Sequence, residues 1–359
     1  MTKIRVLVVE DSVTVRKRLV EVLGDDPDLQ VVGEGANGKE GIELCMRLRP
    51  DVVTLDMMLP VMTGLAATEY IMAHCPTPIL IVSASTNRGE LFRTYDALAA
   101  GAVDVLEKPT DGDVAGDWER RLLAAVKLVS RIKVITHLRG KLEGRRLLAA
   151  TPRGAAAPLA TQLPHAVVAI GVSTGGPAAM QHVLRALPPR FPLPIILVIH
   201  IGEPFGAALA DWLDAQSPLR VTYVRDGELL PPAGQGRVIM APPDVHTVLR
   251  GGMLRLEKTP ERHSCRPSID ALFESIAREL GPRALACLLT GMGRDGAAGL
   301  AEIRSAGGAT IAQDEATSVV FGMPREAILL GAAERVLPLE QIAPAIVAFA
   351  AEPPAGSHP

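Results

Sequence analysis

The hydrophobic positions of residues 1–125 fall into five short apolar runs, each followed by an amphipathic stretch. The apolar runs occupy residues 3–9, 30–33, 51–55, 78–82 and 103–106. Apolar residues at helical spacing occupy residues 13–23, 39–48, 65–74, 89–99 and the stretch from 117 onward. Strands that alternate with amphipathic helices are typical of a parallel sheet covered on both faces. The pattern therefore predicts a five-stranded parallel α/β domain over residues 1–125.

The pattern of residues 166–350 alternates in the same way and predicts a second α/β domain, doubly wound around a mostly parallel sheet. Strands are expected at residues 167–171, 194–199, 221–224, 238–241, 285–290 and 309–313. Helices are expected at residues 178–187, 205–216, 268–280, 297–306 and 324–330. Residues 227–256 are punctuated by Pro-Pro and Gly, which indicates antiparallel hairpins within this domain.

A connector over residues 126–165 separates the two domains. Residues 126–149 carry apolar residues at helical spacing, interleaved with Lys and Arg, and predict that the helix begun at 117 continues. Residues 151–164 are rich in Pro and Ala, which predicts a flexible linker. A basic amphipathic helix can bind an acidic membrane or a partner, but we favour a spacer or docking against the first domain. Residues 351–359 are expected to be a disordered tail.

The charge distribution supports this division. Residues 1–125 hold 13 Lys and Arg against 20 Asp and Glu, residues 126–165 hold 8 against 1, and residues 166–352 hold 16 against 19. The front of the chain is therefore acidic, the connector is basic and the second domain is nearly neutral. Because the second domain lacks a basic surface, a DNA-binding regulator is disfavoured and no nucleic-acid partner is expected.

Composition also indicates the cellular compartment in which the protein is expected. Hydrophobic residues make up 48% of the 359 positions, yet no apolar run reaches the roughly 18 residues of a membrane span. The N-terminal MTKIRVLVVEDS meets acidic residues too early for a signal peptide. The four cysteines are scattered without C-x-x-C spacing, which indicates reduced thiols. We therefore expect a cytoplasmic protein with no membrane insertion.

Five polar side chains follow predicted strands of the first domain, at the sheet edge where ligands bind in such folds. They are Glu10, Asp11, Asp56, Ser83 and Lys108. Crowded carboxylates repel one another unless a cation joins them, and hard oxygen ligands favour Mg²⁺. Asp56 could then attack a phosphoryl donor while Lys108 and Ser83 stabilise the phosphoryl oxygens. Each residue alone could be an ordinary loop residue, but their joint placement favours a phosphorylation site.

The second domain opens on the stretch VVAIGVSTGGPAAM, in which an apolar run ends in a glycine-rich turn before Pro177. Proline suits a first helical turn, so a strand, a tight turn and a helix start would present Ser173 beside free backbone N–H groups. Those donors suit an oxyanion beside a nucleophile, or a phosphate. The phosphate alternative is weak because no P-loop lysine follows, and a plain turn remains possible on this stretch alone.

Ser173, His200 and Asp295 each follow a predicted strand of this domain. If they converge, the histidine can take the serine proton while the carboxylate fixes the imidazole tautomer. The backbone of residues 291–293 could add an N–H group to the oxyanion site. Spacing leaves alternatives open, with His246 or His263 as the base and Asp314 as the acid, whereas Asp270 is expected to cap or flank a helix.

The order of these residues along the chain excludes one familiar fold. Residues 171–175 fit the G-x-S-x-G elbow of α/β-hydrolases, in which the acid follows the serine and the histidine comes last. Here only His358 lies after Asp295, in the tail. The order serine, histidine, aspartate therefore argues for a different fold.

The first domain resembles the receiver domains of two-component signalling. The matching stretches are VVEDS, LDMMLPVMTGL, Ser83-Ala84 and EKP. The resemblance implies a flavodoxin-like fold with Asp56 as the phosphoacceptor. It also implies Mg²⁺ bound by Glu10, Asp11, Asp56 and the carbonyl of Met58. Receivers usually carry an aromatic switch residue near the fifth strand, where this chain has Val105 and Leu106, so the signal readout is expected to be altered.

The second domain resembles the catalytic domain of the CheB family of chemotaxis protein-glutamate methylesterases. The matching stretches are IGVSTGGP, VIHI, IMAPPDVH, RPSIDALFESIA, LLTGMGRDGAAGL and IAQDEATSVVFGMPREAI. Ser173, His200 and Asp295 fall on the family's triad positions, and Met292 falls on its oxyanion donor. The resemblance thus favours Asp295 as the acid, with backbone N–H groups near Thr174 and Met292 holding the oxyanion.

This resemblance implies hydrolysis of glutamate γ-methyl esters and deamidation of glutamines on chemoreceptors. A histidine kinase of the CheA type would phosphorylate Asp56 and relieve inhibition by the receiver. The chain departs from the family pattern at a few positions, which are expected to affect receptor preference and rate. They are Ile199, Ile201-Gly202-Glu203, Cys265 and Arg294. A signalling adaptor with a weak or silent esterase is the alternative, although the intact Ser173, His200 and Asp295 argue against it.

Overall fold

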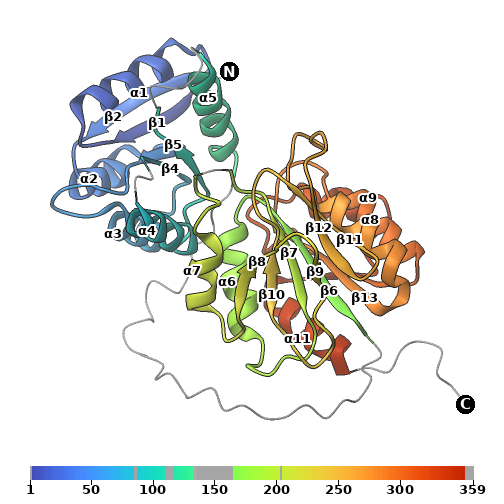
Figure 1. Cartoon of the computed structure of the whole chain (residues 1–359). Helices are drawn as coiled ribbons and strands as arrows, with labels where there is room; N and C mark the ends of the chain where they lie inside the picture. The colour runs from blue at the N-terminus through green and yellow to red at the C-terminus, as the bar shows by residue number, and fades with distance from the viewer. Residues whose placement is uncertain are drawn as a thin grey trace, which may run out of the picture. The chain divides into compact units, whose positions relative to one another are not determined.

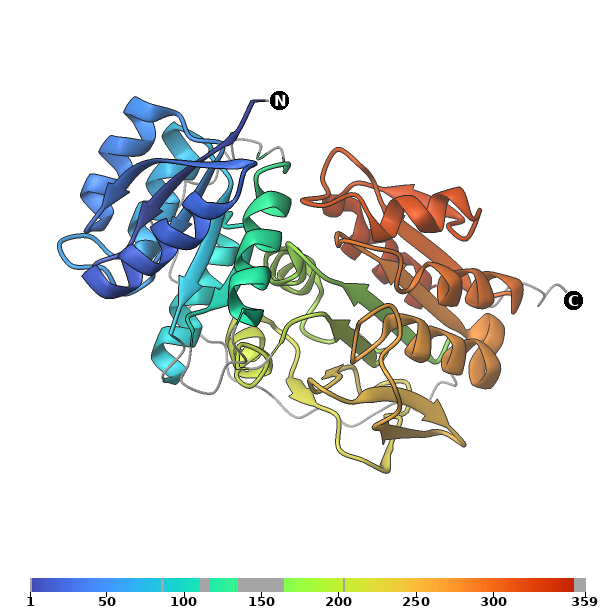
Figure 2. The same cartoon turned by 90° about the horizontal axis from the view of Figure 1, so that it is seen from above.

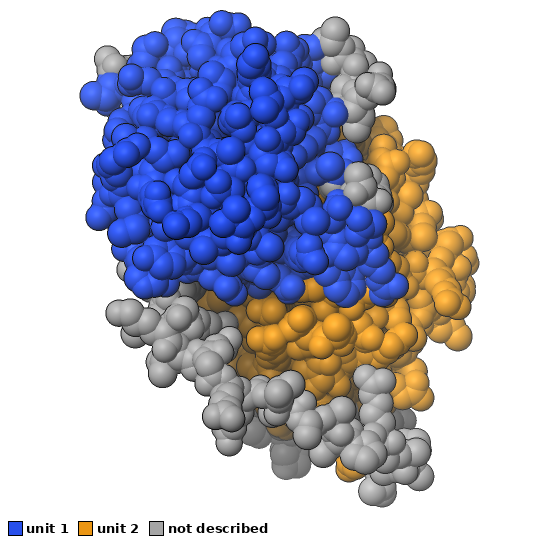
Figure 3. Space-filling view, turned by 90° about the vertical axis from the view of Figure 1, so that its left-hand side faces the viewer, with its two compact units in different colours: residues 1–151 blue, residues 152–359 orange. Residues whose placement is uncertain are grey.

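The chain forms two compact units, residues 1–151 and 152–359, which Figure 3 colours separately. The computed structural model describes residues 2–84, 87–109, 116–132, 134, 165–202 and 204–351. Within these ranges no helix combines the length and the apolar character needed to cross a membrane.

The first unit is built around a five-stranded parallel sheet with the strand order β2-β1-β3-β4-β5 (Figure 1). Its strands are β1 (Ile4–Val9), β2 (Leu29–Gly35), β3 (Val52–Leu55), β4 (Ile79–Ser83) and β5 (Asp104–Glu107). Its helices are α1 (Val13–Asp25), α2 (Gly38–Leu48), α3 (Gly64–His74), α4 (Arg88–Ala99) and α5 (Asp117–Val129). The predicted five-stranded parallel fold is confirmed.

Side-chain caps fix where the helices of this unit begin. Four N-cap side chains each accept a backbone N–H from the first helical turn, namely those of Ser12, Asn37, Thr63 and Asn87. Such a cap contributes about 1 kcal/mol, because the first N–H groups of a helix otherwise lack an acceptor. The β1–α1 and β3–α3 loops, which carry the predicted site residues, are therefore bounded by fixed helix starts.

The predicted continuation of the fifth helix through residue 149 is wrong where it can be followed. Helix α5 ends at Val129, and Ile132 lies outside any helix. The Ser130 hydroxyl donates to the Lys127 carbonyl at 3.0 Å, a local hydrogen bond of the kind that competes with helical pairing. The rest of the predicted helix and linker, residues 133 and 135–164, lies outside the described residues.

The second unit is built around a seven-stranded parallel sheet with the order β15-β14-β13-β6-β7-β10-β8. Its strands are β6 (Val167–Val172), β7 (Ile195–Ile199), β8 (Val221–Tyr223), β10 (Val238–Met240), β13 (Ala284–Leu288), β14 (Ala309–Gln313) and β15 (Arg335–Leu337). Its helices are α6 (Gly176–Ala186), α7 (Leu209–Gln216), α8 (Ile269–Leu280), the 3-10 turn η2 (Gly281–Arg283), α9 (Ala297–Ser305), α10 (Met323–Leu329) and α11 (Leu339–Ala351). Helix α8 packs on α9, and α6 packs on α7 and α11, so the sheet is covered on both faces (Figure 2).

The predicted hairpins are confirmed as a small antiparallel sheet with the order β11-β12-β9. Its strands are β9 (Glu228–Leu229), β11 (His246–Arg250) and β12 (Met253–Glu257). The pattern missed β15 because it is short, and α11 because Pro344 interrupts its periodicity. Residues 205–208, predicted as helical, form turns, and helix α7 begins at Leu209. The first residue of the predicted tail, Ala351, is instead the last residue of α11. The rest of the tail, residues 352–359, lies outside the described residues.

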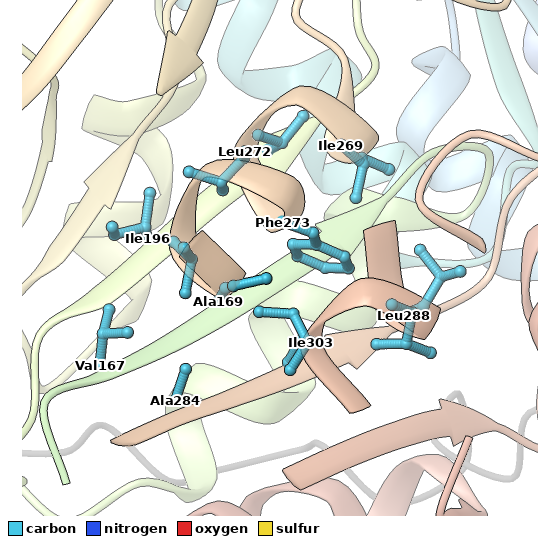
Figure 4. Close-up of a cluster of buried hydrophobic side chains, with 14 of the residues drawn as sticks. Val167, Ala169, Ile196, Ile269, Leu272, Phe273, Ala284, Leu288 and Ile303 are labelled. Carbon is cyan, nitrogen blue, oxygen red and sulfur yellow. The ribbon is translucent and has the colours of Figure 1, made fainter. Parts of the chain in front are cut away.

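The core of the second unit is made of small aliphatic side chains with few aromatic ones. Phe273 of α8 and Ile303 of α9 point into one cluster with Ala169 of β6 and Leu288 of β13 (Figure 4). All four side chains are fully buried. Burying one large apolar side chain contributes about 1.5–3 kcal/mol, so this cluster holds α8 and α9 firmly against the sheet. The loops at the carboxyl ends of β6 and β13 are therefore supported on a rigid base.

Candidate active site

Parallel strand pairing brings three chain segments together at the carboxyl end of β6. In the register with β7, Val172 lies beside Ile199, so Ser173 and His200 follow neighbouring strand ends. The His200 amide donates to the Val172 carbonyl at 3.0 Å. On the other side, the Ser173 amide donates to the Thr290 carbonyl at 2.9 Å. Backbone hydrogen bonds from both neighbours thus fix the position of Ser173.

The turn that carries Ser173 depends on close backbone approach. Gly175 has a φ of 78° and caps helix α6, and a side chain there would meet Val319. A Cβ on Gly291 would lie 2.6 Å from the Ser173 Cβ and 2.6 Å from the Met323 Cε. Glycine at 291 therefore leaves the space that Ser173 occupies. The Ser173 hydroxyl itself makes no hydrogen bond to any described residue.

His200 and Asp295 form a direct pair, with His200 Nε2 2.9 Å from Asp295 Oδ2. Asp295 is 1% exposed and accepts three further hydrogen bonds from the start of α8. The donors are the Ser268 hydroxyl at 2.7 Å, the Ile269 amide at 2.7 Å and the Asp270 amide at 3.2 Å. Burial opposes ionisation, but the hydrogen bonds from His200, Ile269 and Ser268 outweigh it and lower the pKa of Asp295.

An ionised Asp295 accepts only, so the proton of a neutral His200 ring is on Nε2 and the lone pair is on Nδ1. Nδ1 lies 3.6 Å from the Cys265 sulfur. Burial disfavours the charged ring, yet hydrogen bonds to Asp295 and Cys265 outweigh burial and raise the pKa of His200 to about 9. The buried pair therefore favours the imidazolium that forms when this ring takes a proton.

Two backbone amides beside the Ser173 turn are free to bind an anion. Among the described residues, the N–H groups of Thr174 and Met292 have no hydrogen-bond acceptor. Thr174 precedes helix α6, and Met292, with 55% of its side chain exposed, follows Gly291 beside Ser173. Donors at a helix start and in a glycine turn suit an oxygen that gains negative charge.

The alternative bases and acids have other partners. Both ring nitrogens of the buried His246 are engaged, with the Pro260 carbonyl at 3.1 Å and the Ser268 amide at 3.0 Å. Asp314 binds the amide and hydroxyl of Thr317 at 3.0 and 2.6 Å. These groups therefore hold loops in place rather than meeting His200.

Asp270 lies in the first turn of α8, as a helix-flanking residue was expected to do. Its carboxylate accepts the Gly299 amide at 2.7 Å and lies 3.1 Å from His263 Nε2. Arg294 Nε donates to His263 Nδ1 at 3.1 Å. The cation beside Asp295 in the sequence thus binds a second histidine–aspartate pair.

Two residues near this site were not singled out as functional by the sequence. Ser268 is the N-cap of α8, and its hydroxyl also donates to Asp295. The Pro-Ser-Ile-Asp stretch before an amphipathic helix is a recognisable N-cap signal, but nothing in it names Asp295 as the acceptor. Cys265 was noted only as a departure from a family pattern, and its contact with His200 arises from tertiary packing.

The predicted cluster of the first unit is also assembled. Oxygens of Glu10, Asp11 and Asp56 lie within 4.8 Å of one another. Lys108 Nζ lies 2.8 Å from Glu10 Oε2 and 3.0 Å from Asp56 Oδ2. Burial and the charge of Asp56 raise the pKa of Glu10, against the influence of Lys108. Burial opposes the charge of Lys108, but contacts with Glu10 and Asp56 outweigh it and raise its pKa.

This cluster fits a hard cation and a phosphoryl group. Three carboxylates around one point are the oxygen donors that Mg²⁺ prefers. Ser83 Oγ is buried and has no hydrogen-bond partner among the described residues. A buried hydroxyl without a partner is costly, so its placement favours an incoming acceptor oxygen. The Met58 side chain is exposed and contacts Arg93, with Nη1 3.4 Å from the sulfur.

Comparison with known proteins follows the same division of the chain. Residues 6–115 match the family described as "Response regulator receiver domain", and residues 168–346 match "CheB methylesterase". The chain is 45% identical over 339 residues to "Protein-glutamate methylesterase/protein-glutamine glutaminase 2" of Anaeromyxobacter dehalogenans, covering 94% of this chain and 95% of the relative.

Two further proteins are similar to this chain. A "Protein-glutamate methylesterase/protein-glutamine glutaminase" of Nitrosospira multiformis is 43% identical over 356 residues, with 97% and 98% of the two chains covered. The solved catalytic domain of Thermotoga maritima CheB methylesterase is 36% identical, covers 52% of this chain and 98% of its own, and has a TM-score of 0.49. Identity over nearly the full length of the curated relatives shows that the chain belongs to the CheB methylesterase family, with a receiver domain ahead of the methylesterase domain.

Proposed function

We propose that this chain hydrolyses glutamate γ-methyl esters and deamidates glutamines on chemoreceptors, with Ser173, His200 and Asp295 as its catalytic triad. The names of its full-length relatives support both activities, and the CheB methylesterase and receiver matches support a role in chemotaxis-like adaptation. The observation that carries the residue assignment is the 2.9 Å pair between His200 and the buried Asp295, beside the turn of Ser173. Action on the cytoplasmic helices of receptors would support a cytoplasmic location for the enzyme.

The proposed reaction begins when Ser173 Oγ attacks the carbonyl carbon of the ester or amide. His200 Nδ1 accepts the serine proton, and Asp295 holds Nε2–H and stabilises the charged ring. The amides of Thr174 and Met292 donate to the oxygen that becomes negative. The intermediate then expels methanol or ammonia, which takes its proton from His200. A water molecule, deprotonated by the same nitrogen, attacks the acyl-serine. Ser173 Oγ leaves with the proton from His200, and the receptor side chain is freed as a glutamate carboxylate.

Methanol release from methylated receptor membranes tests this assignment. We expect Ser173→Ala to lower turnover by about a thousandfold or more, because both the nucleophile and the acyl intermediate are lost. Thermal unfolding should be unchanged, since the Ser173 hydroxyl has no partner among the described residues. Substantial turnover in a folded Ser173→Ala variant would exclude the triad and favour the alternative of a signalling adaptor with a silent esterase.

We propose that the receiver, residues 1–125, controls the esterase of residues 166–350 through phosphorylation of Asp56 by a histidine kinase of the CheA type. Glu10, Asp11, Asp56 and the Met58 carbonyl would hold Mg²⁺, which when bound offsets the negative charge of the phosphoryl group. Lys108 and Ser83 would bind the phosphoryl oxygens. The assembled carboxylates and the buried Ser83 hydroxyl support these roles.

The regulatory proposal is tested on the full chain with acetyl phosphate as the donor. We expect the donor to increase methanol release by the wild type, and Asp56→Asn to remain at the unphosphorylated rate. In the wild type, the Met57 amide donates to Asp56 Oδ1 at 2.7 Å. The side-chain oxygen of Asn can accept the same hydrogen bond, so Asp56→Asn should still fold. Equal activation of both proteins would contradict control through Asp56.

A further inference from the structure

Cys265 contacts the one nitrogen of His200 on which the proposed reaction depends. Its sulfur lies 3.6 Å from Nδ1, while Asp295 occupies Nε2 at 2.9 Å. Cys265 is also the only partly exposed cysteine of the chain, because Cys45, Cys75 and Cys287 are all buried. The thiol is therefore the one group of the described residues that hydrogen-bonds the free base position of His200.

The loop before α8 holds this thiol in place. Arg262 and Cys265 exchange two backbone hydrogen bonds of 3.2 and 2.9 Å. Arg262 also binds both carboxylate oxygens of Glu274 at 2.9 and 2.5 Å, which ties the loop to α8. His263 and Ser264 between them adopt φ values of 53° and 59°, the left-handed region that side chains rarely occupy. A loop closed at both ends and strained in its middle presents the sulfur to His200 in a fixed position.

We propose that Cys265 is a positioning residue that engages Nδ1 of His200 in the resting enzyme and must release it before Ser173 can use the same nitrogen. The inference rests on the proposed function, in which Nδ1 takes the serine proton. In the charged resting ring Nδ1–H donates to the Cys265 sulfur, and the thiol S–H donates to the His263 carbonyl at 3.4 Å. The sulfur therefore occupies the nitrogen that the Ser173 hydroxyl must reach, and the two compete for it. The absence of a hydrogen bond from Ser173 to any described residue agrees with this competition.

The contact also determines when the base is available. Among the described residues the titratable groups that touch His200 are Asp295 and Cys265, and both help to raise its pKa to about 9, against burial. Four further ionisable residues do not touch His200 but interact with Asp295 or with one another, namely Asp270, Arg262, His263 and Arg294. Removing the thiol should therefore lower the pKa of His200, and the neutral ring should become available at lower pH.

The first experiment measures the contact without using the esterase reaction. Full-length protein is treated with iodoacetamide, and labelled cysteines are identified by peptide mass spectrometry. We expect rapid labelling at Cys265 only, and a rate at least about tenfold lower in His200→Gln, because the charged ring no longer stabilises the thiolate that reacts. His74→Gln, which removes an exposed histidine of the first unit, is the control and should label like the wild type. Equal labelling of Cys265 in wild type and His200→Gln would overturn the contact.

A second measurement covers the case in which His200→Gln does not fold. The ¹⁵N shifts of the His200 ring are titrated in the wild type and in Cys265→Ala, whose partly exposed site tolerates a smaller side chain. We expect the titration midpoint to move to lower pH in Cys265→Ala, and to move less in Cys265→Ser, whose hydroxyl can still meet Nδ1. An unchanged midpoint in Cys265→Ala would overturn the proposal.

The esterase assay then tests the competition itself. We expect kcat/KM for methanol release at neutral pH to rise by about two- to tenfold in Cys265→Ala, the range of one weak hydrogen bond, with the ascending limb of the pH profile displaced to lower pH. Cys265→Ser should lie between that variant and the wild type. Reduced or unchanged kcat/KM in Cys265→Ala would sink the competition. Loss of all methanol release in the wild type, with His200-dependent labelling intact, would sink the proposed function instead.

Discussion

Asp270 and Asp295 are held by each other's helices. Each carboxylate accepts backbone N–H groups from the first turn of the helix next to the other aspartate. Asp295, which precedes α9, accepts the amides of Ile269 and Asp270 at the start of α8. Asp270, in the first turn of α8, accepts the amide of Gly299 in the first turn of α9. Helix N-termini stabilise negative charge, so two buried carboxylates are held beside each other by the helices that they cap. The position of the proposed catalytic acid therefore depends on a second aspartate.

This exchange makes Asp270→Asn and Asp270→Ala differ in stability. Burial and the charge of Asp295 raise the pKa of Asp270 above 3.8, so its ionised form costs stability once the pH exceeds that value. Asn removes the charge and keeps an acceptor for Gly299, so we expect unfolding in urea at pH 7 to change by less than about 1 kcal/mol. Ala leaves a buried N–H without an acceptor and should cost about 1–3 kcal/mol. Equal losses in the two variants would contradict this account.

His200 predicts how stability and activity change with pH. Its pKa is about 9 in the folded chain against 6.5 when unperturbed, so the charged ring stabilises the fold below pH 6.5 and this contribution disappears as the pH rises to 9. The contribution is on the order of 1–3 kcal/mol. Urea unfolding of wild type and His200→Gln should differ most at pH 6 and converge near pH 9. A difference that does not depend on pH would be incompatible with the raised pKa.

The same titration applies to turnover. The proposed base is the neutral ring, so kcat/KM for methanol release should rise about tenfold per pH unit below 9 and level off above it. The profile is measured with full-length protein on methylated receptor membranes. A plateau that already begins near pH 6 would mean that His200 is not held charged in the resting enzyme.

Gly291→Ala tests the space in which Ser173 lies. The new Cβ would lie 2.6 Å from the Ser173 Cβ and from the Met323 Cε, so Ser173 must move. We expect methanol release to fall by about a hundredfold or more, because a displacement of about 1 Å at a nucleophile has that effect. Gly202→Ala is the control, since a Cβ there meets nothing within 4 Å. Loss of activity in both variants would point to a general sensitivity of these loops.

Ser83→Ala and Thr54→Val form a matched pair in the receiver. Both remove a buried hydroxyl that has no hydrogen-bond partner among the described residues, so neither change should lower the melting temperature. Ser83 ends β4 at the predicted phosphorylation site, whereas Thr54 lies within β3. We expect phosphorylation by acetyl phosphate to slow by about tenfold in Ser83→Ala alone, because one stabilising contact to the phosphoryl group is lost. Similar rates in both variants would remove Ser83 from that site.

The sequence by itself determined both α/β folds and the side chains at their carboxyl edges. Periodicity is a local property, so the strands and helices could be predicted to within a few residues, and parallel pairing then brought Glu10 and Asp56, or Ser173 and His200, to a common edge. Prediction from periodicity failed where the local signals were weak, namely at the short strand β15, at the proline within α11 and at the end of α5.

Only the tertiary structure decided which partners these side chains meet. Spacing left both Asp295 and Asp314 open as the acid, and only a family resemblance favoured Asp295. In the structure Asp295 binds His200, and its carboxylate oxygens accept hydrogen bonds from the start of α8, 25 to 27 residues away in the sequence. Cys265 reaches Nδ1 of His200 across a separation of 65 residues, through a loop that no periodic pattern describes. Hydrogen bonds of this kind require atoms from segments remote in the chain to be positioned to within a few tenths of an ångström. Periodicity fixes which element carries a residue, whereas packing fixes which nitrogen of His200 remains available as the base.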